Sequence, residues 1–399
     1  MTLPLSQISR RLQAPEANVW EVHEDALARK RAGDDIVLLS VGDPDFSTPD
    51  YIADHTVAQI RLGRTHYSPA AGEPELRQCL AQLENSISPR AFVAEQFAIF
   101  SGATAALYAT FSCLLDPGDE VVVPEPMYAA YRGLFAAIGA KIVGVPLRSK
   151  QGGDEFVLDP EAVIAAIGPA TRAVLVNTPG NPCGNIIPST TLETLAAYCR
   201  KADIWFVCDE VYSLITFDGP HISALRAAQD LSNVVVIDGL SKSHAMSGWR
   251  VGWAAASVEL VEELARFGKA SQFGCCQFIQ DGAAYALRHD PPDVELMRLE
   301  YQRRRDFAMA KLDAIPALRY SRPRGGMFIM VDVSRVANDG DEFARRLLDE
   351  AGISTVPGRG FGPSAQTYIR VSLTQPAEIL GPAFDRMATV AAAPRPGRS

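Results

Sequence analysis

Short apolar runs rich in Val and Ile recur through the first two thirds of the chain and alternate with longer segments of helical period. The runs lie at 120–124, 141–147, 172–177, 204–210, 233–240 and 250–256, and segments such as 129–139 and 191–202 space their apolar residues as helices do. Strands without polar alternation are buried on both faces, and their alternation with helices is typical of a mostly parallel sheet. The pattern therefore predicts an α/β fold with three layers around a central, mostly parallel sheet.

The pattern changes after about residue 285. A charged helix at 293–315 precedes a strand at 325–333, a helix at 341–352, a strand at 367–373 and a last helix at about 376–393. This order predicts a smaller α+β domain, which we expect the N-terminal segment to complete. We therefore divide the chain into an N-terminal arm with part of the small domain (1–45), a large domain (46–285) and a small C-terminal domain (286–399).

Composition narrows the class of protein. The chain has 399 residues, 47% of them hydrophobic, and a net charge of −9, with no apolar run long enough for a membrane helix and no secretory signal. Its seven cysteines form no C-x-x-C pair and favour reduced thiols over zinc ligands, so we expect a cytoplasmic protein without a metal. The arginine run at 303–305 is flanked by acids, which favours a solvated helix face over a nucleic-acid contact.

Polar side chains follow the ends of three predicted strands, where open α/β sheets bind their ligands. Asn181 lies in the turn NTPGNPCG, Asp209 ends the strand at 204–210 with Tyr212 three residues later, and Lys242 and Arg250 lie in the interior-like segment GLSKSHAMSGWRVGW. Each feature alone could be a turn or a paired core residue. A carboxylate at the end of a buried strand nevertheless needs a cation or a donor, and buried lysine and arginine need partners.

A fourth feature is the segment SGAT before an apolar helix, with Gly102, Ala103 and Thr104 at the predicted helix start. Such a start can be an ordinary cap or an anion site. An anion site, an asparagine, a buried aspartate and a desolvated lysine at one sheet edge are the groups that hold pyridoxal phosphate. The lysine would form the Schiff base, the aspartate would pair with the pyridine nitrogen, and Arg250 would bind the phosphate.

At this point the chain resembles the fold-type-I pyridoxal-phosphate-dependent aminotransferases of class I and II. The resemblance covers essentially the whole chain and rests on these stretches in this order: SVGDPDF (40–46), THYSPAAGEPELR (65–77), GATAAL (102–107), EPMYAAY (125–131), NTPGNPCG (177–184), CDEVY (208–212), LSKSHAMSGWRVG (240–252), PGRGFG (357–362) and YIRVSL (368–373).

The resemblance implies a role for each matching residue. Lys242 would be the Schiff-base lysine and proton shuttle, and Asp209 the partner of the pyridine nitrogen. The other cofactor residues implied are Tyr212 and Asn181 at the 3-oxygen of the ring, Tyr128 stacked on the ring, and Gly102, Ala103, Thr104, Ser241 and Arg250 at the phosphate. Tyr67 would reach the cofactor of a neighbouring subunit, which implies a homodimer. Arg370, Gly42 and Asn181 would hold the substrate α-carboxylate.

Within the family, the N-terminal W-x-x-H segment (Trp20, His23) is similar to that of arginine:pyruvate transaminases. The resemblance implies an L-amino acid donor, such as arginine or another basic amino acid, a 2-oxo acid acceptor such as pyruvate, and Trp20 as a wall of the substrate site. Arginine would need a carboxylate partner, for which Asp43, Asp45 and Glu24 are candidates.

Two other enzyme classes on this fold remain alternatives: a carbon–sulfur β-lyase, and an oxygen-using oxidase of an arginine-like substrate. A regulator built on this fold would need a DNA-binding module before the segment SVGDPDF, where only about forty residues stand.

Overall fold

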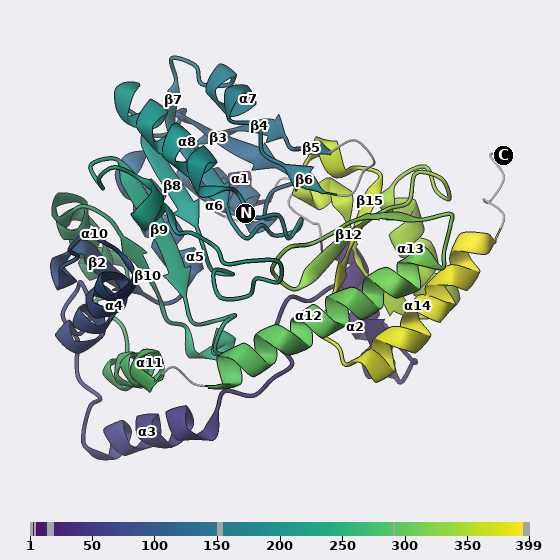
Figure 1. The fold of residues 1–399 in the computed structure, drawn as a ribbon, viewed down its shortest axis with the longest axis horizontal. Helices are drawn as coiled ribbons and strands as arrows, with labels where there is room; N and C mark the ends of the chain where they lie inside the picture. The colour runs from purple at the N-terminus through teal and green to yellow at the C-terminus, as the bar shows by residue number, and fades with distance from the viewer. Residues whose placement is uncertain (1–2, 4, 14–19, 150–154, 290–291, 394–399) are drawn as a thin grey trace.

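A seven-stranded sheet forms the centre of the larger part of the molecule (Figure 1). The computed structural model describes residues 3, 5–13, 20–149, 155–289 and 292–393. In spatial order the strands are β2 (Phe97–Phe100), β10 (Gly252–Ala255), β9 (Val234–Gly239), β8 (Trp205–Asp209), β7 (Thr171–Asn177), β3 (Glu120–Glu125) and β4 (Lys141–Pro146). From β9 to β4 all neighbours pair in parallel, which confirms the mostly parallel sheet.

Two strands differ from the sequence pattern. The strand predicted at 250–256 forms β10, which runs antiparallel to both β2 and β9, and the pattern did not indicate β2 at all. A strand buried on both faces reads as an apolar run in either direction, so its direction is set by the connecting loop and not by its residues.

Alternate residues of the central strands pack into separate cores on the two faces of the sheet, as the period of two requires. On one face Val122 and Val236 pack with α3 (Asp50–Arg61), α4 (Pro74–Ile87), α7 (Pro160–Ala165), α8 (Ser189–Lys201), α9 (Ala224–Ala227) and α11 (Gln277–His289). On the other face Val121 and Val235 pack with α5 (Ala103–Leu114), α6 (Ala130–Ile138) and α10 (Val258–Ser271). The predicted three-layer α/β fold is therefore confirmed.

A smaller α+β unit lies beside the large sheet (Figure 1). Its four-stranded antiparallel sheet has the order β11 (Arg319–Ser321), β12 (Phe328–Asp332), β15 (Tyr368–Ser372) and β14 (Val356–Pro357). Its core also contains residues of α2 (Glu21–Ala32), α12 (Pro292–Asp313), α13 (Gly340–Ala351) and α14 (Ala377–Ala392). β1 (Val37–Leu38) pairs in parallel with β13 (Ile353–Ser354), so both ends of the chain build this unit, as predicted.

The N-terminal arm contacts both units. α1 (Gln7–Leu12) lies on α6, where the Arg11 guanidinium donates to the carbonyl groups of Ala136 (2.6 Å) and Ala137 (2.8 Å).

The last two strands in the described part of the chain, β5 (Arg148–Ser149) and β6 (Phe156–Val157), pair antiparallel with each other. Within the described ranges no helix is both long and apolar enough to cross a membrane.

The arginine run on α12 is not a solvated face. Arg304 and Arg305 are only 4% and 2% exposed. Arg304 donates to both carboxylate oxygens of Asp45 (2.8 and 2.9 Å), and Arg305 donates to Asp218 (2.9 Å). The prediction is wrong for these two arginines because each guanidinium meets a carboxylate from a segment far away in the chain. Of the run, only Arg303 is exposed, next to Glu300.

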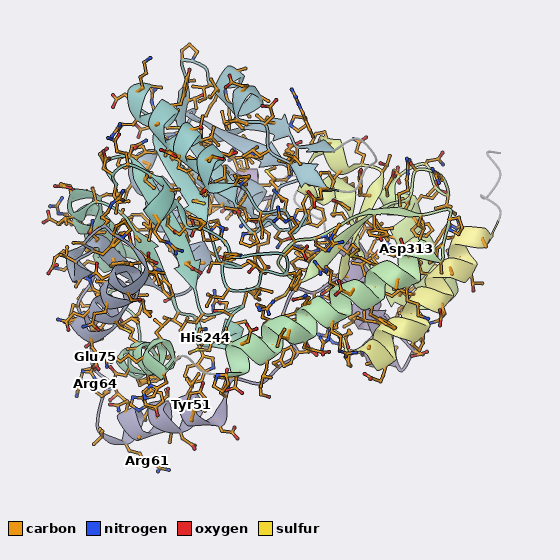
Figure 2. The ribbon with its side chains drawn as sticks, viewed as in Figure 1. Tyr51, Arg61, Arg64, Glu75, His244 and Asp313 are labelled. Atoms are coloured by element: carbon orange, nitrogen blue, oxygen red, sulfur yellow. The ribbon has the colours of Figure 1, made fainter. Side chains whose placement is uncertain are left out.

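Ion pairs also fix the segment after α3. Figure 2 shows Arg64 at the side of the molecule opposite Asp313, which marks the end of α12 beside the small sheet. The Arg64 guanidinium donates to Asp281 on α11 (2.8 and 2.9 Å) and to Glu73 (2.7 Å), and both carboxylates are buried. This network anchors the segment that carries Tyr67.

Candidate active site

A cavity of about 250 Å³ lies where the carboxyl ends of β7, β8 and β9 approach the small sheet. Its walls are Trp20, Gly42, Ala103, Thr104, Leu107, Tyr128, Asn177, Asn181, Asp209, Val211, Tyr212, Ser241, Lys242, Ser247, Arg250, Phe328 and Arg370. All predicted cofactor and substrate residues line this cavity except Gly102 and Tyr67. Strand ends, one helix start and the small sheet therefore bring together residues that are far apart in the sequence.

Lys242 follows β9 and reaches into the cavity. Its Nζ donates to the carbonyl oxygen of Gly42 at 2.7 Å. Burial out of water lowers the pKa of Lys242; Asp43 acts against this shift, and the positive charges of Arg250 and Arg370 add to it. A lysine with a lowered pKa holds more free amine near neutral pH, as a nucleophile or a base requires.

Asp209 ends β8 and is 3% exposed. Its Oδ2 accepts a hydrogen bond from the Tyr131 hydroxyl (2.6 Å), and its Oδ1 accepts a long one from the Val211 N–H (3.4 Å). Burial raises the pKa of Asp209 to about 6, and the hydrogen bond from Tyr131 opposes that shift. The backbone carbonyl of Asp209 accepts from the Thr178 N–H (3.0 Å) and the Asn177 amide (2.9 Å), so main chain and side chain are both fixed.

Tyr131 is a site residue that the sequence analysis missed. It lies in the first turn of α6, three residues after Tyr128, so the two rings share one side of the chain and meet edge to face at 5.4 Å. That spacing was a signal for a shared role, but the contact with Asp209 depends on how α6 packs against β8.

Arg370, on β15, is a buried guanidinium with no carboxylate partner among the described residues. Its Nη1 donates to Asn181 Oδ1 (3.0 Å) and its Nη2 donates to the Ser40 carbonyl (2.7 Å), whereas its Nε has no hydrogen-bond partner in the part of the chain that the structure describes. Its charge lies over the rings of Phe328 (4.1 Å) and Phe361 (5.1 Å). Burial lowers the pKa of Arg370 to about 10. An uncompensated buried cation of this kind favours an anionic ligand.

Two tyrosines and an amide line the wall next to Arg370. Tyr212 is buried, burial raises its pKa, and its hydroxyl lies 3.5 Å from the Asn181 amide nitrogen. Burial also raises the pKa of Tyr128, so both phenols stay protonated at neutral pH. These hydroxyl and amide groups can donate to an oxygen of a bound ligand.

The start of α5 forms the opposite end of the cavity. Gly102 is its N-cap with φ +93° and supplies no side-chain cap, and no acid lies in the first turn, so the N–H groups of Ala103 and Thr104 are open to an anion. A Cβ atom at Gly102 would collide with the guanidinium of Arg250. Arg250 itself is exposed in this chain, with φ +56° and a hydrogen bond to the Ser247 carbonyl (2.7 Å), so the prediction of an interior segment is wrong at this residue.

Trp20, just before α2, lines the cavity. Its ring meets that of His23 edge to face at 5.9 Å, and His23 Nδ1 lies 2.8 Å from the Ser40 hydroxyl. Ser40 is fully buried, accepts a hydrogen bond from the Ser354 hydroxyl (2.9 Å), and provides the carbonyl that Arg370 contacts. α2 is thereby connected to the segment that carries Gly42.

The structure separates the remaining predicted residues from the cavity. Tyr67 is 81% exposed and packs edge to face on the exposed Phe273 at 4.9 Å. Asp45 is held by Arg304, so it is not free for a substrate guanidinium. Asp43 and Glu24 are exposed and do not line the cavity, although the charge of Asp43 acts on Lys242.

The family described as aminotransferase class I and II matches residues 34–383. The chain belongs to this family, whose members depend on pyridoxal phosphate, and it is an aminotransferase. No cluster of three or more histidine, cysteine or acidic residues that could hold a metal ion occurs within the described part of the chain.

The chain is similar to named relatives over nearly its full length. It is 44% identical to an arginine–pyruvate transaminase of Pseudomonas aeruginosa, over 97% of this chain and 98% of that protein. It is 36% identical to an aspartate/prephenate aminotransferase of Thermus thermophilus, over 96% and 98%. The solved aspartate aminotransferase of Thermus thermophilus with maleate superposes with a TM-score of 0.90, at 35% identity, over 98% of this chain and all of that chain.

Proposed function

We propose that this aminotransferase binds pyridoxal phosphate and moves the α-amino group of an L-amino acid, arginine or another basic one, to a 2-oxo acid such as pyruvate. One observation carries the proposal: a desolvated lysine, a buried carboxylate and an uncompensated buried guanidinium line the same cavity. The similarity to an arginine–pyruvate transaminase supports the choice of donor and acceptor.

The residues present fit pyridoxal phosphate. The N–H groups of Ala103 and Thr104, with Ser241 and Arg250, would hold the phosphate at the start of α5. Asp209 would pair with the pyridine nitrogen, Tyr128 would pack on the ring, and Tyr212 and Asn181 would donate to its 3-oxygen. When bound, the cofactor would supply an electron-withdrawing ring that stabilises negative charge on the substrate α-carbon.

Lys242 would bond to the cofactor at rest and act as the base that takes the proton from the substrate α-carbon. Its lowered pKa favours the free amine after the substrate displaces it, and its hydrogen bond to Gly42 supports a reach toward the side where the substrate would bind. The same amine would return the proton at the second carbon, so one residue serves both transfers.

Arg370 would grip the substrate α-carboxylate together with the backbone of Gly42 and with Asn181. The unpartnered Nε and the absence of a competing carboxylate among the described cavity walls near Arg370 support this role. A carboxylate fixed in this way orients the α-carbon so that the bond to hydrogen, and not the bond to the carboxylate, breaks.

The substrate side chain would meet Trp20. Asp209 is the single carboxylate among the described cavity walls, and Tyr131 already contacts it. A substrate guanidinium would therefore stack on the indole face of Trp20. Asp43 is the acid whose charge acts on Lys242. Trp20→Ala and Asp43→Ala should weaken the use of L-arginine more than that of L-alanine, and equal losses for both donors would reject side-chain recognition by these residues.

The exposed aromatic pair Tyr67 and Phe273 supports a homodimer. The pair lies beside the start of α5. The hydroxyl of Ser68, the residue after Tyr67, accepts from the Cys275 N–H (3.1 Å), and the sulfur of Cys275 lies 3.8 Å from the hydroxyl of Ser101, which precedes Gly102. A second subunit that covered this pair could receive Tyr67 at its own phosphate site.

The relatives named as transaminases do not favour the β-lyase and oxidase alternatives.

The direct test compares Lys242→Ala with Lys269→Ala, an exposed lysine outside the cavity. Lys242→Ala should retain pyridoxal phosphate but lose turnover of L-arginine and pyruvate by a factor of at least about 10⁴, because it removes the base and the covalent anchor. Lys269→Ala should keep normal turnover. Normal turnover by Lys242→Ala would reject the assignment.

A further inference from the structure

We propose that Tyr131 is a positioning residue for the cofactor: its hydroxyl fixes one oxygen of Asp209 as an ionised acceptor and leaves the other for the pyridine nitrogen. The inference rests on the proposed binding of pyridoxal phosphate. It assigns a role to a side chain that does not line the main cavity.

The contact between Tyr131 and Asp209 is short and buried. The Tyr131 hydroxyl lies 2.6 Å from Asp209 Oδ2, within the range of a hydrogen bond to a charged oxygen, and Tyr131 is 1% exposed. Its ring is fixed against Tyr128 and by the hydrogen bond from its N–H to the Tyr128 carbonyl (3.0 Å). The packing of the ring therefore holds the tyrosine hydroxyl at this oxygen.

The two oxygens of the carboxylate are therefore not equivalent. Oδ2 has its donor, whereas Oδ1 has only the long contact with the Val211 N–H among the described residues. Asp209 also lines the cavity, so an oxygen is open to a ligand. Removal of the tyrosine hydroxyl would leave a buried carboxylate whose charged form has lost its one strong donor.

The other ionisable groups around Asp209 do not replace Tyr131. Cys208 precedes Asp209 on β8, and Glu210 follows directly after the strand. Burial raises the pKa of Cys208, of Asp238 on β9, of Tyr128 before α6 and of Tyr212 after β8, and the charge of Asp209 adds to each of these shifts. Glu210 is engaged elsewhere, with His221 (3.1 Å) and the Ala224 N–H (2.8 Å). The charge of Glu210 disfavours the charge on Asp209, which makes the tyrosine donor more important.

The test measures the affinity of purified cofactor-free protein for pyridoxal phosphate from pH 5 to 9. Affinity should fall as the pH drops through the pKa of Asp209, because a protonated carboxyl no longer pairs with the pyridinium nitrogen. Tyr131→Phe should move the midpoint of this fall upward by about one pH unit. Site-specific 3-fluorotyrosine at position 131, a stronger donor of the same shape, should move it downward. Tyr301→Phe, which removes a buried hydroxyl that has no hydrogen-bond partner among the described residues, should leave the midpoint unchanged.

The outcomes separate the two proposals. Coincident pH profiles for the unmodified protein and Tyr131→Phe would overturn the role of Tyr131, as would a loss of affinity that is equal at every pH. If Tyr131→Phe does not fold, the direction of the shift with 3-fluorotyrosine decides. In protein that carries Asp209→Asn, the addition of Tyr131→Phe should not change the pH profile of cofactor affinity. Failure of the unmodified protein to bind pyridoxal phosphate would instead reject the proposed function, and this inference with it.

Discussion

Asp209 and Lys242 are ionisable side chains that the fold holds away from water. Burial raises the pKa of Asp209 and lowers that of Lys242, so it favours the neutral form of both. For Asp209 the shift destabilises the cofactor-free protein. The folded-state pKa of about 6 lies above the usual 3.8, so this group costs no stability below about pH 4. The loss grows as the pH rises from 4 to about 6 and is nearly constant above that. At neutral pH the loss is roughly 3 kcal/mol.

Asp209→Asn should therefore stabilise the cofactor-free protein at pH 8 by roughly 2–3 kcal/mol and leave it unchanged at pH 4, because asparagine keeps the shape without the charge. Denaturant unfolding at the two pH values measures the difference. The same variant should lose most of its transaminase turnover, since a neutral amide cannot pair with a pyridinium nitrogen. A gain of equal size at both pH values would contradict the assignment of the cost to this carboxylate.

Sequence reasoning found the residues at strand ends but not those that act through them. Lys242, Asp209 and Asn181 follow apolar strands, so their place at one sheet edge could be predicted from the pattern. Tyr131 could not, because its partner depends on the packing of α6 against β8. The burial of Arg304 could not be predicted for a similar reason: it depends on Asp45, which is distant in the sequence.

At the scale of elements, the start of α5 and the start of α2 position the two ends of the cavity. The strand-to-helix turn before α5 brings backbone N–H groups to the cavity and needs Gly102 for two reasons, a positive φ and the closeness of Arg250. The helix pattern at 103–114 was predictable from the sequence. The closeness of Arg250 was not, because it comes from the pairing of β10 with β2.

Gly102→Ala should weaken binding of pyridoxal phosphate at least tenfold, because the new methyl group displaces the Arg250 guanidinium. Gly118→Ala is the matched control, since Gly118 has a similar φ (+102°) but open space around its Cβ position. Both variants should lose about 1–2 kcal/mol of stability from backbone strain. Equal cofactor affinity in the two variants, measured by equilibrium dialysis, would show that Arg250 has no part in phosphate binding.

His23→Ala should raise KM for the amino donor about fivefold with little change in kcat, because the loss of a hydrogen bond worth about 1 kcal/mol releases the first turn of α2 and with it Trp20. His23→Asn, which keeps a polar atom near Nδ1, should recover most of the loss. Glu24→Ala, an exposed change in the same turn, serves as the control. A fall in kcat at unchanged KM would argue against a role in positioning the substrate wall.

At the scale of the whole molecule, the cavity lies between the cores of the large and the small unit, which the chain builds separately. The core of the small unit draws on both ends of the chain, and the cavity takes Trp20, Gly42 and Arg370 from this unit and the remaining walls mostly from the large one. The α/β class and this small α+β unit could be predicted from the order of apolar runs. The direction of β10 could not, because an apolar run does not encode strand direction.

The proposed dimer predicts that two inactive variants restore each other. Lys242→Ala and Tyr67→Ala should each have low activity alone. A heterodimer of the two would contain one intact site, because the subunit with an intact Lys242 would receive an intact Tyr67 from its neighbour. Random exchange of subunits should give about a quarter of the unmodified activity. Activity is measured after joint refolding of equal amounts, with sedimentation as the check on assembly. Absence of recovery in a mixture that does form dimers would place Tyr67 outside the neighbouring site.

The most direct measurement of the central claim is the absorption spectrum of the protein loaded with pyridoxal phosphate. Addition of L-arginine should convert the cofactor to its aminated form, addition of pyruvate should then restore the original spectrum with formation of alanine, and Lys242→Ala should show neither change. A spectrum that no L-amino acid alters, or the release of ammonia without any need for a 2-oxo acid, would contradict the account.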